Sequence, residues 1–180
     1  MNTRNMDIKS ALATKNRPML PFERDLLYEQ FNHCINKQSA LAKSLGEAMR
    51  QSSETWHDNA PADVVSSDSK VLADRAEMIS ENLRLGLVFD YVDDCEEVTL
   101  GSVCTVQYSP GDEMSVILVG VTRDLPEDIE TQLPDGCVAV TLESPLGAAM
   151  LGASSGSEVL FLVVGGKKTT VKILDIKSVL

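Results

Sequence analysis

Residues with the capacity for chemistry gather in one short polar segment, SSETWHDNAPAD, which covers residues 52–63. Asp58 could cap a following helix, a common role for aspartate at a helix start, and Glu54 could be a solvated loop acid. Trp56, the only tryptophan, could pack across the end of the segment or contact a partner, because exposed aromatic side chains favour interfaces. His57 could serve as a base or a ligand, although a single histidine in a loop is usually neither.

Two helical patterns flank this segment and must position it. In both, apolar residues recur at alternating steps of four and three, which is typical of a coiled-coil seam. The first seam, interrupted by the polar residues Arg24 and Gln38, consists of Leu20, Leu27, Phe31, Cys34, Leu41, Leu45 and Ala48. The second, with Ser69 as its polar member, consists of Val65, Leu72, Ala76, Ile79 and Leu83. A neighbouring set would widen the first seam: Ile35, Ala42 and Met49.

Local signals set the ends of these helices. Pro21 is tolerated in a first helical turn, because its missing N–H would have no intrahelical partner there. Asp58 or Asn59 could cap the second helix, and Gly86 is a suitable C-terminal stop. Two helices joined by a short loop predict an antiparallel hairpin over residues 20–86, with its tip near residues 53–61. Each arm of about 30 residues would be roughly 40–50 Å long.

Beyond Gly86 the apolar pattern becomes strand-like. Runs rich in Val, Leu and Ile follow one another: LVFDYV, VTLGSVCTVQYS, MSVILVG, CVAVTLES, EVLFLVV and TVKILDI. Turn signals separate them, and Gly165-Gly166 predicts a tight hairpin. We expect a short helix in PLGAAML and an acidic loop over residues 122–135. The predicted fold class is therefore α+β: the N-terminal helical hairpin, then a mostly antiparallel β domain over residues 87–180 with one short helix.

The first 19 residues are predicted to form a flexible tail. Their basic residues oppose a single acid, Asp7, and their apolar residues show no sustained period. Pro18 and Pro21 close this segment.

Composition and charge limit the possible functions. The formal net charge of −11 argues against tight, independent binding of duplex DNA, which requires a basic surface. There is no run of 18 apolar residues and no apolar centre of a secretory signal, so we expect no membrane association. No two of the four cysteines have C-x-x-C spacing, which gives no support to a zinc or redox motif. We therefore expect a cytoplasmic protein with reduced thiols and no cofactor of its own.

The β part contains several short motifs that follow one another in a characteristic order. Ser144-Pro145-Leu146-Gly147 is followed by Ala149, Leu151 and Gly152. Val98-Thr99-Leu100-Gly101-Ser102 precedes it and opens a strand, and GSEV, a glycine-bearing hairpin and a KILDI strand follow it. This order resembles the C-terminal domain of the GreA/GreB bacterial transcription elongation factors, over roughly residues 87–180.

The resemblance implies an FKBP-like fold for this domain and RNA polymerase as the partner. In that family the C-terminal domain docks at the rim of the polymerase secondary channel, and the hairpin enters the channel. The tip carboxylates help hold a Mg²⁺ ion of the polymerase active site while the polymerase cleaves backtracked RNA, so contact with the nascent RNA is indirect. A carboxylate suits Mg²⁺, which prefers oxygen ligands. The factor supports this catalysis without being an enzyme itself.

The family tip usually carries two acids three residues apart, followed by Asn-Ala. Here Asp58-Asn59-Ala60 matches the second acid and the Asn-Ala that follows it. Thr55 occupies the position of the first acid and is neutral, with Glu54 beside it. The resemblance thus assigns Asp58 to supporting the Mg²⁺ ion, with Glu54 as the substitute for the missing acid. Pro61 is a further departure from the family pattern.

The sequence leaves alternatives open for both function and site. The chain could stimulate RNA cleavage, could occupy the channel without stimulating cleavage, or could be an interaction module on another partner. An independent prolyl isomerase would rest on fold analogy alone. The resemblance implies that Ser144, Pro145, Leu146 and Gly147 belong to the polymerase-docking surface, but proline and glycine at a strand-to-helix junction are also ordinary turn chemistry.

Overall fold

The structure, a computed structural model, describes residues 3–51, 60–92, 96–108, 111–163 and 165–178. The chain divides into two compact units, one of Asp25–Arg84 and one that combines Met1–Arg24 with Leu85–Leu180. Long helices make up the first unit and a β-sheet dominates the second, which confirms the predicted α+β fold class. No helix in the described part of the chain is long and apolar enough to span a membrane.

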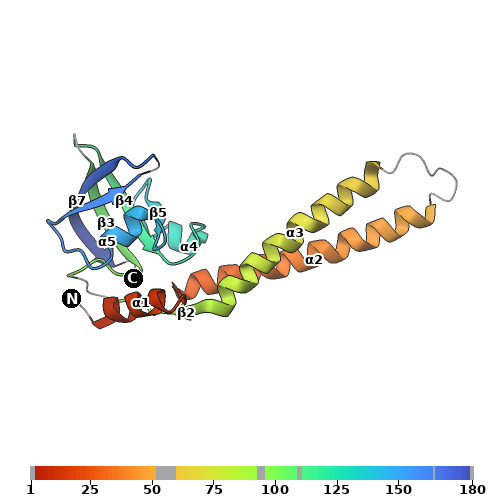
Figure 1. The fold of residues 1–180 in the computed structure, drawn as a ribbon, viewed down its shortest axis with the longest axis horizontal. Coiled ribbons are helices and arrows are strands. Elements are labelled where there is room, and N and C mark those ends of the chain that lie inside the picture. Colours follow the sequence, from red (N-terminus) through yellow and green to blue (C-terminus); the bar gives the residue numbers. More distant parts are fainter. Residues whose placement is uncertain (1–2, 52–59, 93–95, 109–110, 164, 179–180) are drawn as a thin grey trace. The chain divides into compact units, whose positions relative to one another are not determined.

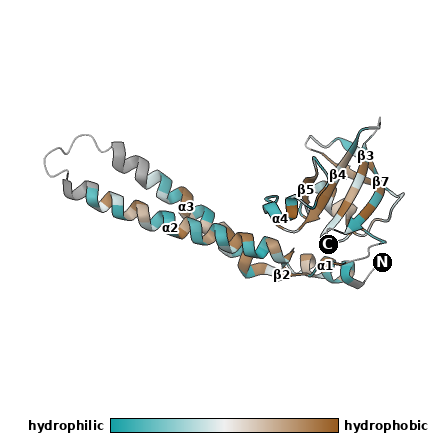
Figure 2. Ribbon diagram, turned by 180° about the vertical axis from the view of Figure 1, so that it is seen from behind, coloured by the Kyte–Doolittle hydropathy of each residue, from teal (hydrophilic) through white to brown (hydrophobic). Residues whose placement is uncertain are grey.

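The helical unit is a hairpin of α2 (Pro21–Gln51) and α3 (Ala60–Leu85), which lie side by side (Figure 1). Gln38 and Ser69, one polar member from each predicted seam, are hydrogen-bonded: Gln38 Nε2 donates to the Ser69 backbone carbonyl at 3.2 Å. The seam itself is confirmed by four buried residues, Leu27, Cys34, Ala76 and Ile79. Ile35 is 43% exposed, so the predicted widening of the seam is wrong at this position. Figure 2 shows hydrophilic residues interspersed along both helices, as expected where a single seam is buried.

The other unit is built on a five-stranded sheet with the strand order β5-β4-β3-β7-β6. The strands are β3 (Ser102–Tyr108), β4 (Glu113–Val119), β5 (Val138–Thr141), β6 (Glu158–Leu162) and β7 (Lys168–Ser178). Only the β4–β5 pair is parallel, which confirms a mostly antiparallel sheet within the described residues. The hairpin predicted at Gly165-Gly166 is also confirmed, because both glycines have positive φ, 90° and 76°, between β6 and β7.

Both faces of the sheet are buried. Val116 and Leu118 belong to one core cluster, whereas Ile117 and Val119 belong to a second. Because side chains alternate along a strand, these clusters lie on opposite faces. This explains the unbroken apolar run MSVILVG. The predicted short helix is confirmed as α5 (Pro145–Met150). Its buried residues Leu146 and Met150 belong to the first cluster.

The predicted acidic loop over residues 122–135 contains a helix, α4 (Glu127–Glu130). Ile129 is 5% exposed and joins the second core cluster, against which Leu125 and Leu133 also pack. Leu125 precedes α4 and Leu133 follows it, so apolar residues on both sides of the helix help to cover this face of the sheet. The loop prediction followed the acids and missed this covering role.

The prediction of a flexible tail is wrong for the described residues before α2. They form α1 (Thr3–Ala13) and β1 (Arg17–Met19), and β1 pairs in parallel with β2 (Gly86–Val88). Ile8 is fully buried in the first core cluster. The strand expected in LVFDYV is reduced to β2, and β3 begins at Ser102 rather than at Val98.

Asn5 explains how α1 is attached. It is fully buried, and its Nδ2 donates to the Glu97 carboxylate at 3.2 Å and to the Val98 carbonyl at 3.3 Å. Both acceptors lie more than 90 residues further along the chain. The N-terminal helix is therefore part of the β unit.

Candidate functional site

The end of the hairpin carries the predicted catalytic-support residues. Glu54, Trp56 and Asp58 lie outside the described residues, so the roles assigned to them remain predictions. The structure describes the helices on either side, of 31 and 26 residues, which extend about 46 and 39 Å at 1.5 Å per residue. These helices can hold a short segment far from the base of the hairpin.

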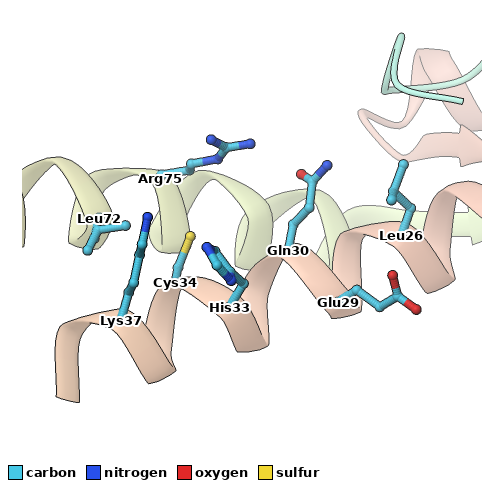
Figure 3. A pocket seen from close by; sticks show the side chains of 8 residues that line it. All are labelled: Leu26, Glu29, Gln30, His33, Cys34, Lys37, Leu72 and Arg75. Carbon is cyan, nitrogen blue, oxygen red and sulfur yellow. The ribbon is translucent and has the colours of Figure 1, made fainter. Parts of the chain in front are cut away.

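An open groove of about 520 Å³ runs along the side of the hairpin (Figure 3). Leu26 and Leu72 are half-buried in its lining, and Cys34 is buried there. In Figure 3, Lys37 and Arg75 extend from different helices toward one side of the pair, whereas Glu29 points in another direction. The groove therefore combines a few apolar side chains with a polar lining that includes Glu29, Lys37 and Arg75.

Sequence reasoning missed these two cations. Lys37 and Arg75 directly precede the seam residues Gln38 and Ala76, a position where charged residues gather in coiled coils. A second hollow, of about 350 Å³, adjoins Lys37 and also contains Asp68. The side of the hairpin is thus of mixed charge.

Ser144 starts the helix α5 and serves as its N-cap. Its Oγ accepts a hydrogen bond from the Gly147 N–H at 3.1 Å and donates one to the Thr141 carbonyl at 2.7 Å. Pro145 occupies the first helical turn, where its missing N–H costs nothing. Ser144 is therefore occupied in holding α5 to the end of β5, and the exposed member of this motif is Pro145.

Gly147 and Leu146 also have structural tasks. A Cβ atom at Gly147 would lie 2.1 Å from the Thr141 carbonyl oxygen, so only glycine permits this close approach of α5 to β5. Leu146 is 8% exposed and belongs to the first core cluster. The turn and the packing of α5 thus account for the contacts of these four residues. Their role in docking stays a prediction.

A shallow hollow of about 300 Å³ lies beside Pro145. Its wall is mostly apolar and includes Val138 and Leu162, which are 46% and 53% exposed. Arg123 is the one charged residue among those that line it in the described chain. Sequence reasoning missed all three, because they come from segments that only the folded sheet brings together.

Glu23 is the most unusual titratable residue near the start of the hairpin. It is fully buried, and its carboxylate accepts four backbone hydrogen bonds. One comes from Leu20 at 2.8 Å, as in a capping box. The others come from Gly120, Val121 and Thr122, at 2.9, 2.7 and 3.0 Å. Burial raises the pKa of Glu23, and the four N–H groups oppose this change because they favour the charged form.

Gly120 completes this junction. A Cβ atom there would lie 1.9 Å from the Pro18 carbonyl oxygen, so β1 can approach the end of β4 only because residue 120 is glycine. The first turn of α2 is thereby fixed to the β unit by Glu23 on one side and by the strand β1 on the other. Sequence reasoning missed both residues, although Glu23 at the third position of α2 was a local signal for a capping box.

The described residues offer no metal centre. They contain no group of three or more His, Cys, Asp or Glu side chains arranged to hold a metal ion. Cys34, Cys104 and Cys137 are free, and burial raises the pKa of the Cys137 thiol. The contact with Mg²⁺ assigned to Asp58 and Glu54 concerns residues outside the described part of the chain and stays a prediction.

Comparison with known proteins gives one family match. Residues 93–178 match the model of the C-terminal domain of the transcription elongation factors GreA/GreB. No curated protein matches the chain in sequence. Among solved structures, GreA factor homolog 1 (Gfh1) of Thermus thermophilus is 18% identical with a TM-score of 0.40, covering 91% of this chain and 99% of that one. A GreA/GreB factor from Nitrosomonas europaea is 22% identical with a TM-score of 0.33, covering 57% of this chain and 78% of its own.

Proposed function

We propose that this protein, whose residues 93–178 match the model of the C-terminal domain of the GreA/GreB transcription elongation factors, binds RNA polymerase and inserts its helical hairpin into the secondary channel. The observation that carries this proposal is the family match, which includes Ser144–Gly147 and the whole five-stranded sheet. The long hairpin in the same chain supports it, because two helices of this length are suited to reaching a distant site.

We further propose that the tip carboxylates support cleavage of backtracked RNA. Asp58, and Glu54 in place of the neutral Thr55, would help hold a Mg²⁺ ion of the polymerase, and that ion would supply Lewis-acid chemistry at the RNA phosphate. The protein would contribute carboxylate oxygens and would have no active site or cofactor of its own. Its contact with the nascent RNA would be indirect.

The cleavage proposal predicts a loss of activity in Asp58→Ala. We expect this variant to release short 3′ RNA fragments from backtracked complexes about 10- to 100-fold more slowly than the wild type, the usual effect of removing a group that supports a metal. Asp68→Ala, which removes an exposed acid of α3, is the matched control and should keep full activity. The absence of fragments at saturating wild-type protein would refute the cleavage role.

A second candidate function is a polymerase regulator that occupies the channel without stimulating cleavage. Thr55 favours it, because a neutral residue at the first acid position removes one expected ligand. Thr55→Asp separates the two readings: a channel occupant should gain cleavage activity, whereas a factor that already works through Glu54 should change little. A pull-down that recovers another complex and no polymerase subunits would instead indicate an interaction module on a different partner.

Docking of the C-terminal domain is proposed to use Pro145 and the hollow beside it. Arg123→Glu should weaken polymerase binding about tenfold, because reversing a charge at the rim of an interface introduces repulsion. Pro145→Ala should weaken binding without changing the thermal unfolding of the domain, since this side chain is exposed. Equal polymerase affinity of both variants and the wild type, measured by titration, would place the docking surface elsewhere.

A further inference from the structure

Strand β6 forms an edge of the five-stranded sheet and exposes two leucines. Leu160 and Leu162 are 57% and 53% exposed, whereas the alternate residues Val159 and Phe161 are buried. Exposed edge strands are usually shielded by charge, by proline or by a covering element, because they can pair with another chain. Two large apolar residues in succession on the open face of such a strand therefore call for an explanation.

The backbone of β6 is also available for pairing. Val163 N–H donates to the Lys167 carbonyl at 3.0 Å, and Ile173 N–H donates to the Ser157 carbonyl at 2.9 Å. Hydrogen-bonded and non-hydrogen-bonded pairs alternate along an antiparallel ladder. The residues between these two bonds that fall in non-hydrogen-bonded pairs with β7 are therefore Glu158, Leu160 and Leu162.

The N–H and C=O groups of these three residues point away from β7. Within the described residues no strand pairs with that side of β6. The exposed leucines and the free backbone groups thus belong to the same residues, so one extended segment could engage both.

Lysines flank this edge. In the register of the sheet, Leu162 lies opposite Lys168 and Glu158 lies opposite Lys172. The charge of Glu158 can compensate that of Lys172, which lies opposite it. Lys167 and Lys168 then make the end of the strand beside Leu162 positively charged. All four charged residues are exposed. In a chain with a net charge of −11, this end of β6 is locally basic.

We propose that β6 is a docking edge for an extended segment of a partner protein, apolar at alternate positions and acidic at the end that lies beside Lys167 and Lys168. The segment adds to the sheet as a further strand. Its N–H and C=O groups pair with those of Glu158, Leu160 and Leu162, and its apolar side chains cover the two leucines. Leu162 also lines the hollow beside Pro145, but the peptide test below uses no polymerase, so its outcome is independent of the docking proposed there.

Other occupants satisfy fewer of these features. A nucleic acid would contact the lysines but would leave the outward backbone groups and the leucines without partners. A second copy of this chain would offer, along its own β6, only one acid, Glu158, against the two lysines. An acidic extended peptide matches the backbone, the apolar side chains and the local charge together.

The test uses two synthetic peptides and the full chain. The first, acetyl-Ser-Val-Thr-Val-Ser-Glu-Glu-amide, has the proposed pattern, and the second replaces both glutamates by lysines. We expect the acidic peptide to bind at least tenfold more tightly. Its binding should slow amide hydrogen exchange at residues 158, 160 and 162 but leave residues 159 and 161 unchanged, because these already bond to β7.

Leu160→Pro is the decisive variant, with Leu160→Thr as its matched control. Proline removes the outward N–H without breaking a bond to β7, so the sheet should tolerate it at this edge. We expect Leu160→Pro to weaken binding of the acidic peptide at least tenfold and Leu160→Thr, which keeps the N–H, to retain most of it. Lys167→Glu combined with Lys168→Glu should reverse the preference between the two peptides.

Several outcomes would overturn the proposal. Equal binding of both peptides would show that charge does not select the occupant. Unchanged binding by Leu160→Pro, or peptide protection that spares residues 158, 160 and 162, would place the site elsewhere. A dimer in sedimentation experiments that Leu160→Pro dissociates would assign the edge to self-association instead.

Discussion

Replacing Glu23 by alanine is expected to lower the free energy of unfolding of the β unit by about 3–5 kcal/mol, because four backbone N–H groups would lose their acceptor. The bonds to Leu20 and Gly120 are buried, so water cannot replace the carboxylate there without opening the junction. Removal of a desolvated acid offsets part of this cost. Urea unfolding followed by circular dichroism measures the change as a lower midpoint.

The matched control for this prediction is Glu29→Ala, which removes an exposed glutamate from the same helix. It should change the unfolding free energy by about 0.5 kcal/mol or less, as is usual for surface substitutions. Glu23→Gln distinguishes shape from acceptor capacity, because the amide keeps one oxygen and turns an NH₂ group toward N–H donors. A Glu23→Ala protein within 1 kcal/mol of the wild type would contradict the anchoring role.

The consequence of this anchor is local to the β unit. Glu23 fixes the first turn of α2 to the segment after β4, and Gly120 lets β1 lie against the same segment. We therefore expect Glu23→Ala to accelerate amide exchange at residues 120–122 even under conditions where the sheet remains folded, since those N–H groups lose their acceptor.

Sequence reasoning succeeded where a pattern repeats many times. The alternation of four and three predicts the hairpin because several turns agree on one seam, and Leu27, Cys34, Ala76 and Ile79 are buried accordingly. The strands were predicted from their apolar runs in the same way. The polar interruptions at Gln38 and Ser69 also followed the pattern, and the bond from Gln38 to the Ser69 backbone carbonyl gives the Gln38 amide a partner in the seam.

Sequence reasoning failed where an apolar pattern is too short to define a period, and where the stabilising contacts join residues far apart in the sequence. The apolar residues Ile8, Ala11 and Leu12 span little more than one helical turn, too few to define a period. Their burial depends on the β unit, and Asn5 reaches partners more than 90 residues away. The donors to Glu23 from Gly120, Val121 and Thr122 are equally remote, so no local signal could have identified them.

The candidate site was predictable in part. The motif Ser144–Gly147 was identified as a turn that starts a helix, and the capping bond of Ser144 agrees with that interpretation. The hollow beside Pro145 was not predictable, because Arg123, Val138 and Leu162 meet only after the sheet has formed. The roles of Asp58 and Glu54 follow from the resemblance to the GreA/GreB tip, and cleavage assays are the measurement that will decide them.

Gly147→Ala is expected to lower the free energy of unfolding by about 3 kcal/mol or more, because its Cβ would overlap the Thr141 carbonyl oxygen and force α5 away from β5. Side-chain rotation cannot relieve this clash, since the two nearest atoms belong to the Thr141 backbone. Urea unfolding of the variant measures the loss. Polymerase binding by this variant would fall with stability, so Gly147→Ala reports on packing, and Pro145→Ala is the variant that reports on docking.

Gly46→Ala provides the matched control, because it adds the same methyl group to a glycine with no atom within 4 Å of the new Cβ. Gly46 lies inside α2, where alanine is the better helix former, so this variant should be more stable than the wild type by about 0.5–1 kcal/mol. Opposite signs for the two substitutions would show that close approach to Thr141, and not the loss of glycine itself, determines the cost. If Gly147→Ala proved as stable as Gly46→Ala, α5 would be free to move away from β5, and the motif Ser144–Gly147 would owe its glycine to partner contact instead of packing.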